Sequence, residues 1–341
     1  MSQKDLIVVT GAGGFIGGHL VSDLMSRESG RIRAVDRKPV ANWYQRIDGV
    51  ENIVADLRDP EACRRVCAGA DRVFQLAADM GGMGFIETHK ADCMLSVLIN
   101  THMLIAARDA GVERFFYASS ACVYNAEKQS DPQLTALREE DAYPALPEDG
   151  YGWEKLFSER MCRHFREDFG LETRIARYHN VYGPHGTWEG GREKAPAAIS
   201  RKVVEAQVSG EPQIEIWGNG EQTRSFMYIE DCLEGTHRIM ESQVSEPLNL
   251  GSSELVSINQ LVSLLEEIAG LRLTRFYNPD APVGVAGRNS DNRKILEHLG
   301  WEPSIDLRSG MERTYKWIHD EYARRYGGRM GPKRAAQRGS A

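Results

Sequence analysis

The opening of the chain carries the feature that most constrains its fold. A short apolar run over residues 6–9 leads into a glycine-rich run over 10–17 and then into a helical pattern over 15–26. Glycine lets the backbone turn tightly and approach a pyrophosphate, and the following helix N-terminus offers unpaired N–H groups to phosphates. Asp36 ends the next apolar run, over 32–35. This order of strand, turn, helix and acidic residue predicts a dinucleotide-binding α/β fold.

Apolar runs alternate with longer helical patterns through the first half of the chain. Further strands are predicted over 52–54, 72–76, 114–117, 173–176 and 248–250, and further helices over 91–110 and 151–169. Strands separated by helices imply right-handed crossovers and a parallel sheet covered on both faces. We therefore expect a Rossmann-type, doubly wound parallel sheet over residues 1–180, to which segments around 220–251 return.

The alternation loosens from about residue 181, where glycine and proline mark a long loop. Caps and periodicity predict three more helices, from Pro196 up to Gly210, over 258–269 and over 307–326. We expect residues 181–326 to form mainly a smaller, mixed substrate-binding lobe, and residues 327–341 to form a flexible basic tail.

Size, charge and cysteine content narrow the class of protein. The 341 residues allow one large domain and a smaller lobe, and 41% hydrophobic residues are ordinary for a globular protein. The formal charge of −7 argues against a nucleic-acid binder with a broad basic face. No apolar run approaches the roughly 20 residues of a membrane helix. No secretory signal is visible and the six cysteines show no metal-ligand spacing, so we expect a cytoplasmic protein without a metal site.

The glycine run and the ends of the first strands predict where a dinucleotide binds. Asp36 can accept hydrogen bonds from the adenosine ribose hydroxyls, and its carboxylate disfavours a 2′-phosphate, so NAD is favoured over NADP. Arg37 and Lys38 follow directly and weaken that preference. Asp56 either meets the adenine edge or is a solvated turn residue. The predicted cofactor contacts are Gly11, Gly14, Phe15, Ile16, Gly17, Asp36, Asp56, Ala77, Tyr151 and Lys155.

A tyrosine and a lysine, Tyr151 and Lys155, stand four residues apart in a predicted helix, downstream of Ser120. One helical turn places both on one face. A tyrosine pKa near its ordinary value of about 10 makes a poor base at neutral pH, but a nearby ammonium and a positive nicotinamide ring lower that pKa. Ser120 is expected to hydrogen-bond the substrate oxygen. These residues predict that a proton leaves an alcohol while a hydride leaves for the nicotinamide.

These motifs and several others resemble one family over nearly the whole chain. The chain is similar to the extended short-chain dehydrogenase/reductases of the nucleotide-sugar epimerase and dehydratase group, and within it to the GDP-mannose 3,5-epimerases. The stretches that carry this resemblance are residues 77–85, 118–122, 151–155, 179–184, 190–196, 222–226 and 287–291. The most specific are the Met-Gly-Gly-Met-Gly, Ser-Ser-Ala-Cys and Gly-Arg-Glu-Lys-Ala-Pro runs.

The resemblance implies a reaction and roles for further residues. In such an epimerase NAD oxidises C4 of the sugar, and the resulting ketone acidifies the C–H bonds at C3 and C5. Cys122 is implied as the base, since a thiolate is a competent base near neutral pH, and Lys194 as the acid on the opposite face. Hydride then returns to C4. The implied substrate is GDP-mannose, and the implied products are GDP-L-galactose, GDP-L-gulose or both.

The resemblance also implies substrate contacts and an assembly. Arg224 and Arg288 are candidates for the diphosphate, because guanidinium groups bind phosphate in bidentate fashion. A homodimer through the helices predicted at 91–110 and 151–169 is implied. The full set of expected substrate contacts is Gly81, Met83, Ser120, Asn180, Glu193, Lys194, Arg224 and Arg288.

Alternative functions remain open. A nucleotide-sugar 4-epimerase needs no side-chain acid or base at C3 or C5, and the sugar is either mannose or a longer heptose. Another alternative is a regulatory protein that binds NAD without turnover. Such proteins can lose the catalytic tyrosine or lysine, whereas this chain has both, Tyr151 and Lys155. A 4,6-dehydratase normally places an Asp-Glu pair after its active-site Ser or Thr, where this chain has Ala121 and Cys122, so dehydration is not expected.

Overall fold

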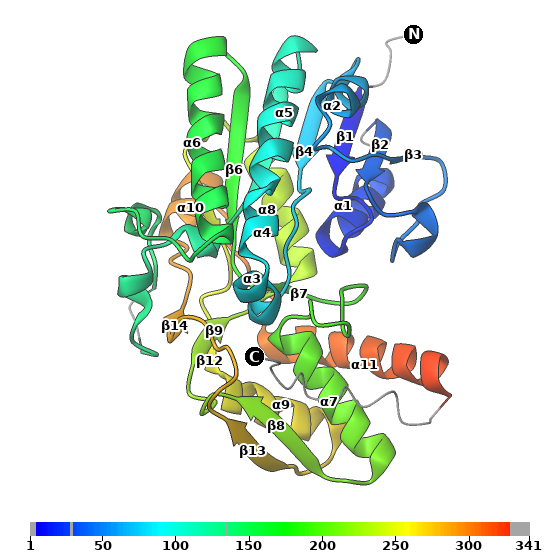
Figure 1. Ribbon diagram of the computed structural model, residues 1–341, viewed down its shortest axis with the longest axis vertical. Coiled ribbons are helices and arrows are strands. Elements are labelled where there is room, and N and C mark those ends of the chain that lie inside the picture. Colours follow the sequence, from blue (N-terminus) through cyan, green and yellow to red (C-terminus); the bar gives the residue numbers. More distant parts are fainter. Residues whose placement is uncertain (1–4, 28–29, 134–135, 328–341) are drawn as a thin grey trace.

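The computed structural model describes residues 5–27, 30–133 and 136–327. Its largest element is a parallel sheet of seven strands in the order β11-β6-β5-β4-β1-β2-β3 (Figure 1). The strands are β1 (Leu6–Thr10), β2 (Arg31–Asp36), β3 (Glu51–Val54), β4 (Arg72–Gln75), β5 (Arg114–Ser120), β6 (Glu172–Tyr178) and β11 (Leu248–Leu250). The predicted doubly wound sheet is confirmed, and its strand order reverses between β1 and β4, the usual place for a ligand in this architecture.

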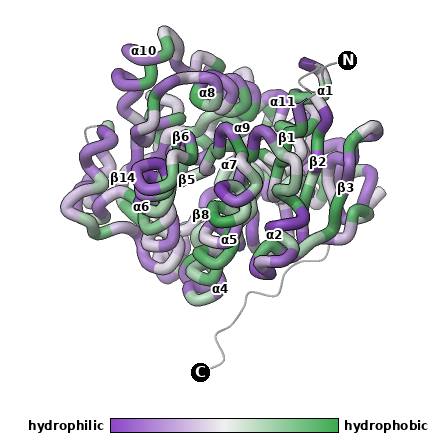
Figure 2. Tube along the Cα trace, turned by 90° about the horizontal axis from the view of Figure 1, so that it is seen from above, coloured by the Kyte–Doolittle hydropathy of each residue, from purple (hydrophilic) through white to green (hydrophobic). Residues whose placement is uncertain are grey.

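Two layers of helices cover the sheet. They are α2 (Pro60–Cys67), α5 (Ser96–Asp109) and α6 (Tyr151–Phe169) on one face, and α1 (Phe15–Ser26) and α8 (Ile229–Glu241) on the other (Figure 2). Successive residues of β1 serve opposite faces: Leu6 packs in the cluster that includes α2, α5 and α6, and Ile7 packs in the cluster with α1 and α8. A strand buried on both faces is apolar throughout, which explains its uninterrupted apolar run.

The prediction of one helix over 91–110 is wrong in one respect, because this segment forms two helices, α4 (Lys90–Met94) and α5. They join at Leu95, whose backbone stays near the helical region with φ −63° and ψ −13°. The Leu98 N–H bonds to the Leu95 carbonyl at 3.1 Å, which is the tighter 3₁₀ pattern. The apolar periodicity continues across such a joint, so the residue pattern alone does not reveal it. A further short helix, α3 (Met83–Thr88), precedes them.

The smaller lobe lies below the sheet in Figure 1. Its helices α7 (Ala195–Ser209), α9 (Ile258–Ala269) and α11 (Leu307–Tyr326) pack on one another, and β8 (Gln213–Trp217) pairs with β13 (Thr274–Asn278) beside them. The helix predicted from Pro196 begins one residue earlier. Gly210 ends it with a φ of 70°, and Ser257 caps α9 through a capping box.

Short strands connect the lobe to the sheet. They are β7 (Val181–Tyr182) paired with β10 (Met227–Tyr228), and β9 (Thr223–Ser225) between β12 (Leu255–Ser257) and β14 (Gly287–Arg288). The remaining helix, α10 (Arg293–Leu299), packs near β11. Of the tail predicted over 327–341, only Gly327, which ends α11, lies within the described residues.

Candidate active site

The turn between β1 and α1 has no room for side chains at two of its glycines. Gly11 has a φ of 69°, and a Cβ on Gly17 would lie 2.2 Å from the Gly11 carbonyl oxygen. The Gly14 N–H donates to that same carbonyl at 2.9 Å, and Gly14 caps α1 without any side-chain hydrogen bond. The N–H groups of the first turn, which includes Phe15 and Ile16, are therefore left for an anionic ligand. This turn fits the diphosphate of a dinucleotide.

Asp36 ends β2 and is buried. Its carboxylate accepts hydrogen bonds from the backbone N–H groups of Gly13 at 3.1 Å and Lys38 at 2.9 Å. The two cations that follow it are engaged with the protein: Arg37 pairs with Asp79 at 2.9 Å, and the Lys38 ammonium donates to the Gly13 carbonyl. Arg37 and Lys38, whose charges weakened the predicted preference for NAD, thus both have partners within the protein. The acidic end of β2 fits an unphosphorylated ribose.

Two other predicted cofactor residues differ in their surroundings. The Ala77 N–H donates to Thr10 Oγ1 at 3.1 Å, and a Cβ on Gly11 would lie 3.1 Å from the Ala77 nitrogen, so the ends of β1 and β4 are in close contact. Asp56 forms an ion pair with Arg58 at 2.5 Å, which lowers the pKa of Asp56. Its carboxylate is partly exposed, and this geometry favours the solvated-turn interpretation over contact with adenine.

The structure brings Ser120, Tyr151 and Lys155 together, because β5 ends where α6 begins. Tyr151 and Lys155 are both buried. The Lys155 ammonium donates to the Ala118 carbonyl at 3.1 Å and lies 5.5 Å from the centroid of the Tyr151 ring. Burial raises the pKa of Tyr151 well above its ordinary value, and the Ser120 hydroxyl opposes that rise. The side chain is therefore a phenol in this state and needs nearby positive charge to act as a base.

A chain of buried polar side chains joins the glycine turn to Lys155. Thr10 Oγ1 donates to Gln75 Oε1 at 2.5 Å, and Gln75 Nε2 donates to Asn100 Oδ1 at 2.7 Å. Asn100 in turn donates to the Glu154 carboxylate, which lies 3.7 Å from the Lys155 ammonium. The redox residues are thus connected through the interior to the strand that begins the cofactor turn.

Cys122 lies in a 3₁₀ turn, Ala121–Val123, directly after β5. The Cys122 N–H donates to Ser120 Oγ at 3.2 Å, and its buried sulfur accepts a hydrogen bond from Arg288 Nη1 at 3.5 Å. Burial and the Glu148 carboxylate raise the pKa of the thiol to about 11, and Arg288 acts in the opposite direction. The thiolate that the family resemblance implies as the base is therefore not the resting form of Cys122, because burial and the neighbouring carboxylate favour the thiol.

Lys194 is the N-cap residue of α7 rather than part of an open loop. Burial lowers the pKa of its ammonium, and Cys122, Cys232 and Arg288 also act on that charge. Within the described parts of the chain, Lys194 has no ion pair with a carboxylate. The smaller lobe therefore brings an amine into the electrostatic surroundings of the Cys122 thiol.

The loop before α3 holds the segment that leads into α7. The Gly82 N–H donates to the Arg192 carbonyl at 3.0 Å, and a Cβ on Gly82 would lie 2.4 Å from the Glu193 carbonyl oxygen. The Arg192 guanidinium lies 3.7 Å from the centroid of the Phe85 ring and pairs with Asp79 at 2.7 Å. Two of the most specific sequence runs therefore contact each other, and glycine at 82 is required for that contact.

The other predicted residues of these loops are engaged with the protein. A Cβ on Gly81 would lie 2.8 Å from the Phe85 Cβ, and Met83 borders Gly284, where a Cβ would lie 2.9 Å from the Met83 Cε. Further contacts involve the side chains of Asn180, which donates to the Ser225 carbonyl at 2.9 Å, and Glu193, which accepts from the Gly191 N–H at 2.5 Å. The structure gives these four residues defined positions, and their contact with a sugar stays a prediction.

The two candidate diphosphate ligands, Arg224 and Arg288, are neighbours on the paired strands β9 and β14. Arg224 donates to backbone carbonyls, including that of Val285 at 2.7 Å, and burial and Arg288 lower its pKa to about 10. Arg288 donates to Gln129 Oε1 at 2.8 Å and pairs with Glu148 at 2.9 Å. Arg288 is thus committed to a buried carboxylate and to Cys122, rather than free for a phosphate.

Sequence reasoning missed Glu148. Only 11% of its side chain is exposed, and its backbone N–H donates to the Cys122 carbonyl at 3.1 Å. It lies in a polar loop just before Tyr151, where an acidic residue is most simply interpreted as solvated. No sequence signal marked it, because its partner Arg288 comes from the far end of the chain.

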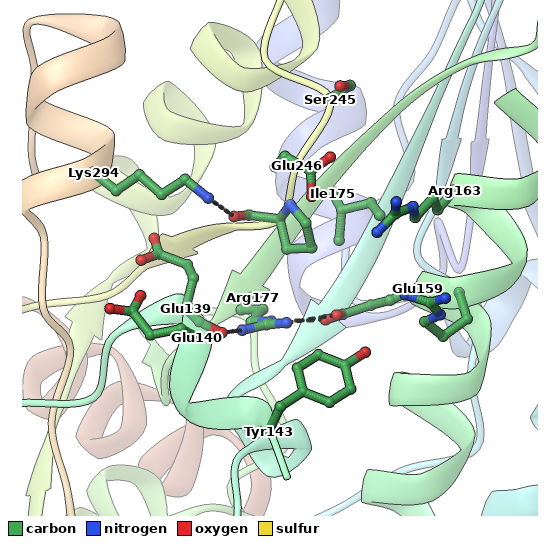
Figure 3. A pocket seen from close by; sticks show the side chains of 12 residues that line it. Glu139, Glu140, Tyr143, Glu159, Arg163, Ile175, Arg177, Ser245, Glu246 and Lys294 are labelled. Atoms are coloured by element: carbon green, nitrogen blue, oxygen red, sulfur yellow. Dashed lines mark hydrogen bonds and ion pairs between the residues drawn. The ribbon is translucent and has the colours of Figure 1, made fainter. Parts of the chain in front are cut away.

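A separate cavity of about 250 Å³ borders α6 and β6 (Figure 3). Its wall contains Arg177, which pairs with Glu159 at 2.7 Å and donates to the Glu139 carbonyl at 2.7 Å. Glu159 also accepts a hydrogen bond from Ser119 Oγ at 2.5 Å. None of the predicted site residues lines this cavity. The Arg177–Glu159 ion pair therefore contacts the serine run through Ser119 and lies outside the candidate active site.

Residues 5–27, 30–133 and 136–327, which the structure describes, also bear on metal binding and membrane insertion. In these ranges no group of three or more His, Cys, Asp or Glu residues could hold a metal ion. No helix among them is both long and apolar enough to cross a bilayer. The six cysteines are buried and free.

Residues 7–251 match the NAD dependent epimerase/dehydratase family. The chain belongs to this family. NAD is accordingly its cofactor, and the uncapped start of α1 and the buried Asp36 fit that group. Members of the NAD dependent epimerase/dehydratase family include close relatives of this chain. This chain is 47% identical over 321 residues to GDP-mannose 3,5-epimerase 1 of Oryza sativa subsp. japonica, and the match covers 94% of this chain and 83% of that protein.

Further relatives support the resemblance noted in the motifs. The chain is 46% identical to GDP-mannose 3,5-epimerase of Arabidopsis thaliana, covering 94% of this chain and 84% of that protein. Among solved structures, UDP-glucose 4-epimerase from Thermotoga maritima matches with a TM-score of 0.82 at 26% identity, covering 93% of this chain and 99% of that one. MoeE5 in complex with UDP-glucose and NAD matches with a TM-score of 0.77 at 30% identity, with the same coverage. The predicted resemblance is confirmed.

Proposed function

We propose that this protein epimerises the nucleotide sugar GDP-mannose at C3 and C5, giving GDP-L-galactose, GDP-L-gulose or both. The observation that carries the proposal is that the charge of Lys194, from the smaller lobe, interacts with the Cys122 thiol at the end of β5. That site also contains Tyr151, whose pKa responds to the Cys122 charge. The proposal is supported by relatives of 46% and 47% identity that are GDP-mannose 3,5-epimerases.

The first step makes a ketone at C4. Tyr151 takes the proton of the C4 hydroxyl while Ser120 hydrogen-bonds the oxygen, and Lys155 stabilises the phenolate. NAD, held at the glycine turn and Asp36, would supply a reversible hydride acceptor for C4, so that no net oxidation would occur.

The second step inverts the neighbouring carbons. The C4 ketone withdraws electrons, so a base can remove the proton at C3 or C5 and leave the electron pair as an enolate on the ketone oxygen. Cys122 takes that proton in its thiolate form, which the resting thiol reaches by releasing its own proton to solvent. Lys194 then donates a proton to the same carbon from the opposite face, and the configuration inverts. The returned hydride at C4 completes the cycle.

Product identification tests the proposal. Purified holoenzyme is incubated with GDP-mannose, and the products are separated and assigned by proton NMR. We expect sugars inverted at C3, C5 or both, and the Cys122→Ala variant should retain NAD and form neither. A product inverted only at C4 would favour a 4-epimerase. Turnover of a GDP-heptose alone would favour the heptose alternative, and NAD binding without any turnover would favour a regulatory protein.

We also propose a homodimer through α4, α5 and α6. Large apolar side chains are exposed on these neighbouring helices, namely Met94, Leu95, Leu98, Trp153 and Phe157. Trp153 and Phe157 are one turn apart on α6 and therefore share a face. Such an exposed patch is unusual on a monomer, and a second copy of this chain would cover it through a two-fold contact.

For localisation we propose the cytoplasm. Its support is that the cysteines remain free and buried, which suits a reducing compartment.

A further inference from the structure

Cys122, Glu148 and Arg288 form a buried cluster that the mechanism above uses only in part. Cys122 is 7% exposed, and the Glu148 and Arg288 side chains are 11% and 5% exposed. Arg288 Nη2 lies 2.9 Å from Glu148 Oε1, and Arg288 Nη1 lies 3.5 Å from Cys122 Sγ. One guanidinium therefore contacts both a carboxylate and the proposed base.

The backbone fixes this arrangement before any substrate arrives. The Glu148 N–H donates to the Cys122 carbonyl at 3.1 Å, so the two residues cannot separate without losing that bond. A Cβ on Gly152 would lie 2.4 Å from the same carbonyl oxygen, so the first turn of α6 packs directly against it. Glu148 Oε2 is buried without a hydrogen-bond partner in the described chain. The carboxylate is held beside the thiol with one oxygen committed to Arg288.

Other charged or titratable groups also face the thiol. Arg224 and Lys194 are the further cations whose charges interact with Cys122, and Tyr151 is a neighbouring phenol. Among these neighbours Glu148 is the carboxylate that acts most strongly on the sulfur, and it opposes Arg288. Removing the Glu148 charge would leave the cations unopposed, and cations favour the thiolate.

We infer that Glu148 is a positioning residue that keeps Cys122 in its thiol form in the resting enzyme by neutralising Arg288. The consequence for catalysis rests on the proposed function, because it assumes that Cys122 acts as a base. The charge state itself does not depend on substrate. A resting thiol is a weak nucleophile, so the resting pocket is protected from alkylation and oxidation.

The charge state of Cys122 is measured directly by alkylation. Holoenzyme is treated with iodoacetamide over a range of pH, and modification of the peptide that carries Cys122 is followed by mass spectrometry. The Glu148→Gln variant keeps the shape of the side chain and loses its charge. We expect its alkylation midpoint to fall by about one pH unit or more, the usual effect of a close charge on a pKa. An unchanged or higher midpoint would overturn the inference.

Two further variants make the result unambiguous. Glu148→Asp keeps the charge but lengthens the distance to Arg288, so its alkylation midpoint should lie between those of the wild type and Glu148→Gln. This variant also serves as the test if Glu148→Gln does not fold. Glu266→Gln is the matched control, because Glu266 is also buried and pairs with Arg275 at 2.9 Å, in the smaller lobe. Its midpoint should equal that of the wild type. A fall in this control equal to that of Glu148→Gln would contradict the inference.

A pH profile of substrate proton exchange separates this inference from the proposed function. Exchange at C3 and C5 needs Cys122 as a thiolate and Lys194 as an ammonium. Once the pH exceeds the pKa of the thiol, a further rise in pH no longer produces thiolate and only removes the Lys194 proton, so the exchange rate falls. In Glu148→Gln this alkaline fall should move to lower pH, together with the alkylation midpoint. Absence of exchange in the wild type with a lowered midpoint in the variant would reject the proposed function alone. Wild-type exchange with an unmoved midpoint would reject the role of Glu148 alone.

Discussion

The two halves of the candidate active site are built in different ways. Ser120, Tyr151 and Lys155 come from one strand end and one helix, and buried polar side chains join Lys155 to the cofactor turn. Cys122 and Lys194 come from different lobes, and contacts of a partly exposed arginine hold the segment before Lys194. The redox half is local, whereas the acid–base half depends on how the lobes meet. A family can therefore keep one oxidation step and change the reaction by changing the second half.

The strongest test of this contrast removes the redox half. Tyr151→Phe keeps the ring in the core and removes the proton acceptor, so the C4 ketone does not form. We expect both hydride transfer and exchange at C3 and C5 to fall by about 10²–10⁴-fold, the usual contribution of a general base. Absorbance of enzyme-bound NADH and deuterium uptake by NMR measure the two steps. Exchange at the wild-type rate in this variant would show that the halves do not act in sequence.

Removing the acid should separate the halves. Lys194→Met keeps the length of the side chain without the amine, and we expect inversion at C3 and C5 to fall by about 10²-fold while oxidation at C4 persists. Because oxidation continues, NADH absorbance should remain detectable during turnover. Lys316→Met, at a lysine whose side chain is 79% exposed on α11, is the control and should leave both steps unchanged. Equal loss of both steps in Lys194→Met would mean that the lysine serves the redox half.

The redox half was predictable from the sequence because its signals are local. Tyr151 and Lys155 lie one helical turn apart, and α6 runs over Tyr151–Phe169, the range predicted from the sequence. The glycine turn was equally clear, because Gly11 and Gly17 satisfy a backbone contact within a few residues. Patterns of this kind need no knowledge of the tertiary structure.

The acid–base half was predictable only through family resemblance. Glu148 and Arg288 are 140 residues apart in the chain, and neither stands in a pattern that signals the other. The raised pKa of Cys122 depends on burial and on that carboxylate, which a linear motif does not record. The short strands β9, β12 and β14 have two or three residues each, too few for periodicity to show.

A milder change tests whether contact between the lobes sets the acid–base half. Arg192→Ala removes the ion pair with Asp79 and the contact with Phe85, so the start of α7 is held less firmly. We expect inversion to fall by about 10-fold because a small displacement of the acid is costly, with little change at C4. The change in unfolding free energy should stay within ~1 kcal/mol, as for other exposed ion pairs. Arg64→Ala, which removes an exposed pair with Glu61, should leave inversion unchanged.

The smallest effect on chemistry is expected at the proposed dimer surface. Phe157→Lys places a charge in the exposed patch on α6, where Phe157 is 50% exposed. Light scattering should show that the wild type has twice the monomer mass and that the variant is a monomer. Activity per active site should change little, because no residue of either half lies in that patch. A wild-type protein that is monomeric at all concentrations tested would contradict the dimer.

The fate of the sugar hydrogens tests the two-part account most directly. GDP-mannose is incubated in heavy water with the wild type and with Cys122→Ala, and deuterium is located by NMR. The account predicts that the wild type introduces solvent deuterium at C3 or C5 and leaves C4 unlabelled, because the C4 hydrogen returns as hydride, and that the variant labels none of these positions. Deuterium at C4, or normal labelling of C3 and C5 by the variant, would contradict it.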